Sequence, residues 1–405
     1  MMNICIEAVD LILDAIYSIG ERDELLSQFT ICEPNSPIWS HGIGTEIYTR
    51  NQQDYLKALV FIKQNGASYL RKLPTSEVRN KVTNFLTENF WFIREGEFSR
   101  NPNISYKIQI PVEAKLNLAN ALLNSSLFKE ELNTFLYPFN SIYLENDLIF
   151  DNFFIINSQN LSLQHMNIDV RYSNEFDFLY YPSIRNENHN RKRISTWIGI
   201  KAPTEEISRR TLYSVLGAIS LFEESKKRYC FNSRCEDSGF SYFSNQSSYT
   251  YRQTQNLTPN LYFKLKVKNE LAIHLEHLSS LLKSNDKTSQ RSISALTSFY
   301  KSWFEKDAEQ YRTFCSCIEA LIEDTRSKSS QKFRDLSKSY ITKFSETQLK
   351  DLLKIRGNIV HGKAPHLYDS ENYDFYVERY LSEPRSDLLE IVEKVLKKHI
   401  FQIQG

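Results

Sequence analysis

The sequence has few glycines and prolines, no long hydrophobic run and almost no net charge. Gly and Pro number 11 each among 405 residues, which favours regular elements over long flexible linkers. No apolar run approaches the roughly 18 residues of a membrane-spanning helix, so we expect no membrane as a partner. The formal net charge of +1 excludes a global field that would draw the whole molecule onto nucleic acid. Any basic surface must therefore be local.

Cysteine usage and the N-terminal segment point to a reducing compartment. Glu7, Asp10 and Asp14 interrupt the first apolar segment, where a signal peptide needs an unbroken one. The cysteine spacings match no common zinc pattern, so we expect free thiols, no metal site and no cofactor in a cytoplasmic protein. The six cysteines are Cys5, Cys32, Cys230, Cys235, Cys315 and Cys317.

The length and the hydrophobic patterns predict an α+β protein with several regions. A chain of 405 residues exceeds one ordinary core, and 41% hydrophobic with 24% charged residues is typical of a globular protein. We expect a mixed helical and strand region over 1–136, a β-rich region over 137–268 and a helical domain over 269–405. The fold class is thus a mixed α/β N-terminal region followed by an all-helical C-terminal bundle.

The first two regions show alternating helical and strand patterns. Apolar spacing predicts helices over residues 1 to about 30, over 49–73 with a stop near Gly66, and over 115–136. Shorter patterns predict strands over 89–98 and 103–112. In the middle region, short Ile-, Phe- and Tyr-rich runs such as 141–158 and 195–203 predict strands, and the amphipathic segment 208–225 predicts a helix.

After Pro259 the chain becomes a succession of amphipathic helices separated by polar joints, which is typical of a helical bundle. Their predicted core positions are Leu271/Leu275/Leu278/Leu282, Ile293/Leu296/Tyr300/Trp303, Phe314/Ile318/Leu321/Ile322, Phe333/Leu336/Tyr340, Leu349/Leu352/Leu353 and Leu388/Val392/Val395/Leu396.

One of these helices carries an arginine on its apolar face. Ser345 and Gln348 fit a capping box at its start, and Gly362 just past His361 marks its end. At about 100° per residue from Leu349, Arg356 lies near −20°, in the middle of the apolar face. Burying a lone guanidinium costs several kcal/mol, so Arg356 must have a partner or line a polar cleft or subunit junction.

His361 follows at the last turn, where the helix dipole favours an imidazolium and acid–base work is feasible. It lies ~7.5 Å from Arg356 along the axis, so both side chains can reach one phosphate. From this spacing alone, the favoured interpretation is an arginine in a structural ion pair and a histidine that interacts with the helix carbonyls, because such a short pattern is common by chance.

A second segment makes the pattern more specific. "LLKIRGNIVHGK" resembles the C-terminal signature of HEPN domains of the ApeA-like branch, which ends a helix with Arg-polar-x3-His-Gly. Upstream, Cys317-Ile318-Glu319-Ala320-Leu321 resembles that branch's Ala-Leu-Glu-Ala-Leu-like segment. The resemblance covers about Gln290 to Gly405. It departs at Gly357, where the branch usually carries Asn, Asp or His.

The resemblance implies metal-independent RNA cleavage that leaves a 2′,3′-cyclic phosphate. His361 would be the acid–base group and Arg356 would bind the scissile phosphate. Three residues would support them. Glu319 would orient Arg356 or His361, and Asn358 would replace the polar side chain that is missing at Gly357. Lys363 would contact a phosphate. It also implies a homodimer or higher homo-oligomer in which two Arg/His sets face one cleft.

Three functions fit these features. The first is an endoribonuclease toxin of bacterial antiviral defence or abortive infection, acting on RNA such as tRNA, with an N-terminal region that responds to a phage or cellular trigger. The second, favoured by Gly357, is a non-catalytic HEPN module that binds RNA or assembles with protein. In the third, the N-terminal part is the active piece and the helical domain serves dimerisation.

Two weaker candidates remain. The basic stretch with Arg185, Arg191, Lys192 and Arg193 could bind RNA, although a solvated loop between two strands is the favoured interpretation. His274 and His277 share a predicted helix at a spacing near that of metal ligands, but a bundle-surface pair is the better interpretation.

Overall fold

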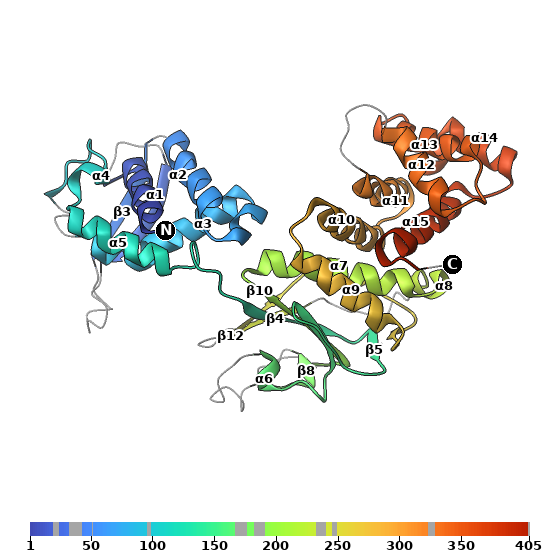
Figure 1. Cartoon of the computed structure of the whole chain (residues 1–405), viewed down its shortest axis with the longest axis horizontal. Coiled ribbons are helices and arrows are strands. Elements are labelled where there is room, and N and C mark those ends of the chain that lie inside the picture. Colours follow the sequence, from blue (N-terminus) through green and yellow to red (C-terminus); the bar gives the residue numbers. More distant parts are fainter. Residues whose placement is uncertain are drawn as a thin grey trace. The chain divides into compact units, whose positions relative to one another are not determined.

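The computed structural model divides into two compact units, Met1–Leu132 and Asn133–Gly405. Each unit mixes helices with small sheets and the C-terminal part is helical, which confirms the predicted α+β class (Figure 1). The structure describes residues 1–18, 24–31, 43–50, 52–94, 99–166, 176–181, 191–231, 240–244, 249–322 and 329–403.

The first unit packs helices around a three-stranded antiparallel sheet of order β1-β3-β2. Helix α1 buries Cys5, Val9 and Ile12 completely and contacts α2 and α5. The elements are α1 (Met2–Ala15), β1 (Ile16–Ser18), β2 (Glu24–Ile31), β3 (Ile43–Thr49), α2 (Gln52–Asn65), η1 (Ser68–Lys72), α3 (Thr75–Asn89), η2 (Phe90–Phe92), α4 (Tyr106–Gln109) and α5 (Val112–Asn124).

Several sequence predictions for this unit were wrong. The first helix ends at Ala15 instead of continuing to about residue 30, because Ile16 begins a strand that pairs with Thr49 of β3. The strands expected over 89–98 and 103–112 are absent from the described residues of these segments, which hold the short helices η2 and α4. The helix expected over 115–136 ends at Asn124, and the last residues of the predicted range, from Asn133 on, belong to strand β4.

The second unit contains a six-stranded antiparallel sheet of order β12-β11-β4-β10-β7-β6, with two small two-stranded sheets, β13-β5 and β8-β9. The strands are β4 (Asn133–Phe139), β5 (Ile142–Leu144), β6 (Leu148–Ile149), β7 (Phe153–Asn157), β8 (Tyr180–Tyr181), β9 (Lys192–Arg193), β10 (Thr196–Ala202), β11 (Phe240–Ser244), β12 (Tyr249–Gln253) and β13 (Leu265–Val267). The strands predicted over 141–158 and 195–203 are confirmed.

The helices of this unit confirm the predicted succession after Pro259. Most of the apolar residues from which these helices were predicted are buried. Helix α14 was not predicted. The helices are α6 (Leu163–Met166), α7 (Glu205–Phe222), α8 (Ser225–Arg228), α9 (Leu271–Lys283), α10 (Lys287–Ser302), α11 (Asp307–Leu321), α12 (Ser329–Tyr340), α13 (Glu346–Val360), η5 (Leu367–Asp369), α14 (Glu371–Tyr380) and α15 (Pro384–Phe401).

Helix α7 joins the sheet to the bundle. It contacts β10 and also α9 and α10, so that it lies between the strands and the C-terminal helices (Figure 1). One hydrophobic core runs from Ile198 of the sheet through Val215 of α7 to Leu296 and Val395 of the bundle. Residues 137–268 and 269–405, which we expected as separate regions, thus share a core within one compact unit.

A buried arginine adds a polar link across the same unit. Arg228 of α8 is 1% exposed and forms an ion pair with Glu393 of α15. It also donates a 2.5 Å hydrogen bond to the Ser220 carbonyl, and its own carbonyl accepts one from Trp303 Nε1 at 2.8 Å. These bonds fix α8 against α15 and the end of α10.

Within the described residues, no helix is both long enough and apolar enough to cross a membrane.

The approach of α7 to α10 predicts a large difference between two glycine substitutions. A Cβ on Gly217 would lie 2.2 Å from the Leu296 carbonyl oxygen, whereas a Cβ on Gly357 would meet nothing within 4 Å. We expect Gly217→Ala to lower the free energy of unfolding by about 1–3 kcal/mol, because the two helix backbones must separate. Gly357→Ala should raise it by roughly 0.5–1 kcal/mol, because alanine restricts the unfolded chain and favours the helix.

Urea or guanidinium titration of both variants beside the wild type measures these changes. Equal effects of the two substitutions would contradict the close contact at Gly217, since only the contact distinguishes two glycines that both lie within long helices.

Candidate functional site

Helix α13 carries both residues of the candidate site and begins with a defined cap. The Ser345 hydroxyl accepts a hydrogen bond from the Gln348 backbone N–H at 3.1 Å. The Gln348 side chain turns away from this cap and donates to the Tyr376 hydroxyl at 2.9 Å, so only half of the predicted capping box forms. Gln348 instead links α13 to α14.

Arg356 finds its partner on the neighbouring helix α11. Its Nη2 donates a 2.8 Å charge-assisted hydrogen bond to Glu319 Oε2. The two side chains are 31% and 28% exposed, so the pair lies at the edge of the bundle rather than inside the core. The Arg356 Nε is buried and has no hydrogen-bond partner among the described residues. One donor of the guanidinium therefore remains unused.

The surroundings of this pair disfavour negative charge. Burial raises the pKa of the Glu319 carboxyl, and the attraction of Arg356, which lowers it, is the smaller effect. Burial also raises the pKa of the Cys315 thiol far above its usual value, the Glu319 carboxylate adds to the rise and Arg356 opposes it. Cys315 is therefore a neutral thiol beneath the ion pair rather than a nucleophile.

His361 lies directly after the last residue of α13 and is exposed. The turn that follows is fixed by backbone bonds: Gly362 N–H donates to the Ile359 carbonyl at 3.1 Å, and Lys363 N–H to the Asn358 carbonyl at 2.9 Å. Gly362 adopts a φ of 69°, the left-handed conformation that glycine accepts most easily. The histidine thus stands at a rigid helix end.

The two residues that follow Arg356 on the helix, Gly357 and Asn358, have different surroundings. Asn358 donates from Nδ2 to the Ser370 hydroxyl at 3.0 Å and so connects α13 to the start of α14. Its side chain is therefore already engaged at one donor. Around Gly357 the space is open, so an added Cβ would meet no atom within 4 Å.

The remaining predicted site residues lie elsewhere. Lys363 is exposed and its side chain forms no hydrogen bond or ion pair within the described part of the chain. Arg191 pairs with Asp177 at 2.6 Å, and Lys192 and Arg193 form strand β9, far along the chain from α13. Arg185 lies outside the described residues.

The two histidines of α9 pack against aromatic rings. His274 stacks on Phe222 at 4.5 Å, and His277 meets Phe401 edge-on at 6.1 Å. The described residues contain no group of three or more His, Cys, Asp or Glu side chains that could hold a metal ion.

Sequence reasoning missed the polar network that supports α13 from α14. The buried Asp351 of α13 accepts hydrogen bonds from Lys354 at 2.8 Å and from the Tyr380 hydroxyl at 2.9 Å. The Tyr376 hydroxyl of α14 donates to Asp387 of α15 at 2.7 Å. The helical spacing of the tyrosines in "ENYDFYVERY" was the available signal for α14.

The electrostatics of Glu319 predict how Glu319→Gln changes the pH dependence of stability. Since the pKa of Glu319 is raised above its ordinary 4.5, the folded chain holds this proton more tightly than the unfolded chain. Its stabilising contribution is fully present below pH 4.5 and is lost as the pH rises through the raised pKa. The difference in the free energy of unfolding, wild type minus variant, should therefore fall as the pH rises from 4.5.

Denaturant titrations of both proteins over a series of pH values test this direction. A difference that rises with pH would mean that attraction by Arg356 outweighs the burial of the carboxylate.

No family model, curated protein or solved structure matches the chain. The candidate site therefore consists of Arg356, which Glu319 holds, and His361, which is exposed at the end of the same helix.

Proposed function

We propose that the protein is a metal-independent endoribonuclease of the HEPN type that leaves 2′,3′-cyclic phosphate ends. The contact between Arg356 and Glu319 is the observation that carries the proposal. These residues belong to the two segments that resemble HEPN domains, and they meet at 2.8 Å at the edge of the bundle. Arg356 is thus held by the other segment, on the helix that ends at an exposed histidine.

The proposed reaction needs no group beyond the protein and the RNA. The ribose 2′-oxygen attacks the adjacent phosphorus as a base removes the hydroxyl proton. The bond from phosphorus to the 5′-oxygen breaks, and an acid gives that oxygen a proton. His361 serves as one of these proton carriers. Arg356, oriented by Glu319, stabilises the charge that develops on the phosphoryl oxygens.

One histidine carries one proton role at a time, which favours pairing of two copies. If two copies place their α13 ends at one cleft, one His361 acts as base while the partner's equivalent residue acts as acid. A half-exposed ion pair and an exposed histidine at the bundle edge suit such a junction. The protein is therefore proposed as a homodimer or higher homo-oligomer.

The biological role that fits this activity is bacterial antiviral defence or abortive infection in the cytoplasm, with cleavage of RNA such as tRNA arresting growth. A ribonuclease of this kind needs restraint, so residues 1–132 would respond to a phage or cellular trigger. The alternative is a non-catalytic module that binds RNA or assembles with protein, and the missing polar side chain at Gly357 favours it.

Substitution of the two central residues tests the activity. We expect Arg356→Ala and His361→Ala each to reduce RNA cleavage by at least about 100-fold, because each removes a group that acts in the transition state. Lys363→Ala, which removes a positive charge just beyond the same turn, should change cleavage little. The measurement is the production of cyclic-phosphate ends from total RNA and tRNA in EDTA.

Thermal unfolding of each variant controls for loss of structure. Cleavage at equal rates by the wild type and both variants would exclude these residues as the active site. Absence of cleavage by the wild type, together with no growth arrest when it is expressed, would favour the non-catalytic alternative.

The open space at Gly357 allows a gain-of-function test. Gly357→Asn adds the type of side chain that the resembling family carries, and nothing lies within 4 Å of the added Cβ. We expect cleavage to rise about 2–10-fold, the effect of one added hydrogen bond in the transition state. Gly357→Ala is the matched control, since it adds the Cβ without the amide. An equal response to both substitutions would exclude a polar role for this position.

A further inference from the structure

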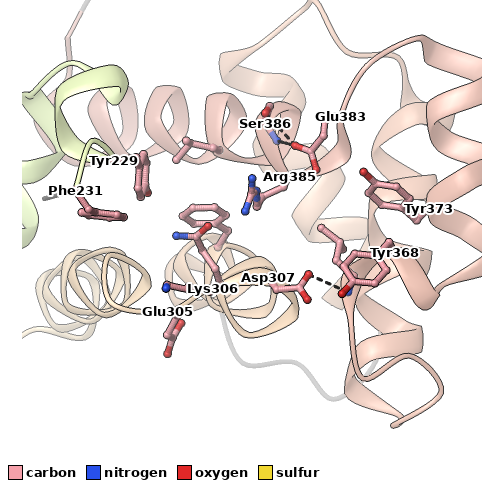
Figure 2. A pocket seen from close by; sticks show the side chains of 14 residues that line it. Tyr229, Phe231, Glu305, Lys306, Asp307, Tyr368, Tyr373, Glu383, Arg385 and Ser386 are labelled. Atoms are coloured by element: carbon pink, nitrogen blue, oxygen red, sulfur yellow. Dashed lines mark hydrogen bonds between the residues drawn. The ribbon is translucent and has the colours of Figure 1, made fainter. Parts of the chain in front are cut away.

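A second site lies in the same unit, away from Arg356 and His361. A cavity of about 670 Å³ opens where the start of α11, the short helix η5 and the first turn of α15 meet Tyr229 and Phe231 (Figure 2). Its volume is in the range of pockets that hold small molecules. The residues assigned to RNA cleavage do not line it.

Aromatic rings stand on two sides of this cavity. Tyr229 and Phe231 lie on one side, and Tyr368 and Tyr373 on the other (Figure 2). Phe231 is 45% exposed and Tyr368 is 60% exposed. Tyr368 already stacks on His366 at a centroid distance of 5.4 Å, whereas Phe231 meets Tyr229 edge-on at 6.4 Å. The exposed face of Phe231 therefore leaves apolar surface in water that a flat ligand would cover.

Two carboxylates of the cavity accept hydrogen bonds from other groups of the protein. Asp307 accepts hydrogen bonds from His366 Nδ1 at 3.1 Å and from the Leu367 N–H at 3.0 Å. These bonds hold Asp307 at a φ of 52°, which is strained for a residue other than glycine. Glu383 caps α15 by accepting from the Ser386 N–H at 2.7 Å. Neither carboxylate forms an ion pair with Arg385 or Lys306 in the described part of the chain.

The two cations that line the cavity, in contrast, have no bonding partner within the described residues. The side chains of Arg385 and Lys306 form no hydrogen bond or ion pair with other parts of the chain that the structure describes. Arg385 projects between the two groups of rings (Figure 2). A guanidinium offers paired donors that match phosphate oxygens. Arg385 and Lys306 are therefore the two cations of the cavity that can bind a phosphate.

A third polar group completes the set. Glu305 lines the cavity, and its Oε2 is buried without a hydrogen-bond partner in the described residues. Burial raises the pKa of this carboxyl. The unpartnered oxygen can bond to the polar edge of a heterocycle.

From these contacts we propose that the cavity binds a ribonucleotide. The base stacks on the side formed by Tyr229 and Phe231, and the phosphate binds Arg385 with Lys306 nearby. This assignment does not depend on RNA cleavage by Arg356 and His361. The nucleotide is either free or part of a single RNA strand, since the ring and the phosphate are the same in both.

Isothermal titration calorimetry on the full chain tests the proposal. The probes are the four ribonucleoside 5′-monophosphates, adenosine, inorganic phosphate and a short 2′-O-methylated single-stranded RNA, which lacks the attacking hydroxyl. We expect at least one monophosphate or the RNA to bind with a Kd of about 1 mM or tighter. Adenosine and phosphate alone should each bind about tenfold more weakly or worse, because each satisfies only half of the site.

Variants assign the binding to the cavity. Arg385→Gln and Phe231→Ala should each weaken it by about tenfold, through loss of the phosphate contact and of ring stacking. Arg385→Lys should retain part of it. Lys394→Gln, which removes a charge further along the same helix, should leave it unchanged. Binding of a monophosphate identifies a free nucleotide, and binding of the RNA alone identifies a strand. No binding by any probe, or binding that Arg385→Gln and Phe231→Ala leave unchanged, would overturn the proposal.

Discussion

The close contact of α7 with α10 at Gly217 is the constraint on which the second unit depends. Because Gly217 has no side chain, the Leu296 carbonyl reaches the backbone of α7, and α7 can pack on the sheet and on the bundle at once. The sheet and the C-terminal helices consequently share one core. The helices that carry Arg356 and His361 are thereby supported by the β-rich part of the chain rather than forming a separable bundle.

Two arginines of this unit differ in burial. Arg228 is 1% exposed and its guanidinium is engaged by Glu393 and the Ser220 carbonyl, so removing it would leave the buried Ser220 carbonyl without this donor. Arg356 is 31% exposed and has one ion pair, and the Nε of each arginine has no hydrogen-bond partner among the described residues. Its partner Glu319 has a raised pKa because burial outweighs the attraction. A pair of this kind stabilises the fold little, which leaves it free to serve another role.

The sequence predicted the C-terminal helices well because their apolar residues recur at helical spacing and become the core. It also predicted that Arg356 needs a partner, since helical geometry placed it on the apolar face. The errors occurred where contacts distant in sequence decide the local structure. Ile16 leaves the first helix because it pairs with Thr49. Only half of the capping box forms because the Gln348 amide donates to the Tyr376 hydroxyl instead. The cavity at Arg385 could not be predicted, since it combines residues from four separate segments.

The segment between His361 and Leu367 links the two sites of this unit. At its start, the N–H groups of Lys363 and Ala364 both donate to the Asn358 carbonyl, and at its end Asp307 holds His366 and Leu367. His361 therefore stands on a turn whose backbone is anchored on both sides, which would fix the start of its side chain for the proton transfer proposed above. The anchor at Asp307 is itself part of the cavity wall. A ligand that contacts Leu367 or Tyr368 would act on the same anchor, and this shared segment is the shortest physical route by which occupancy of the cavity can influence His361.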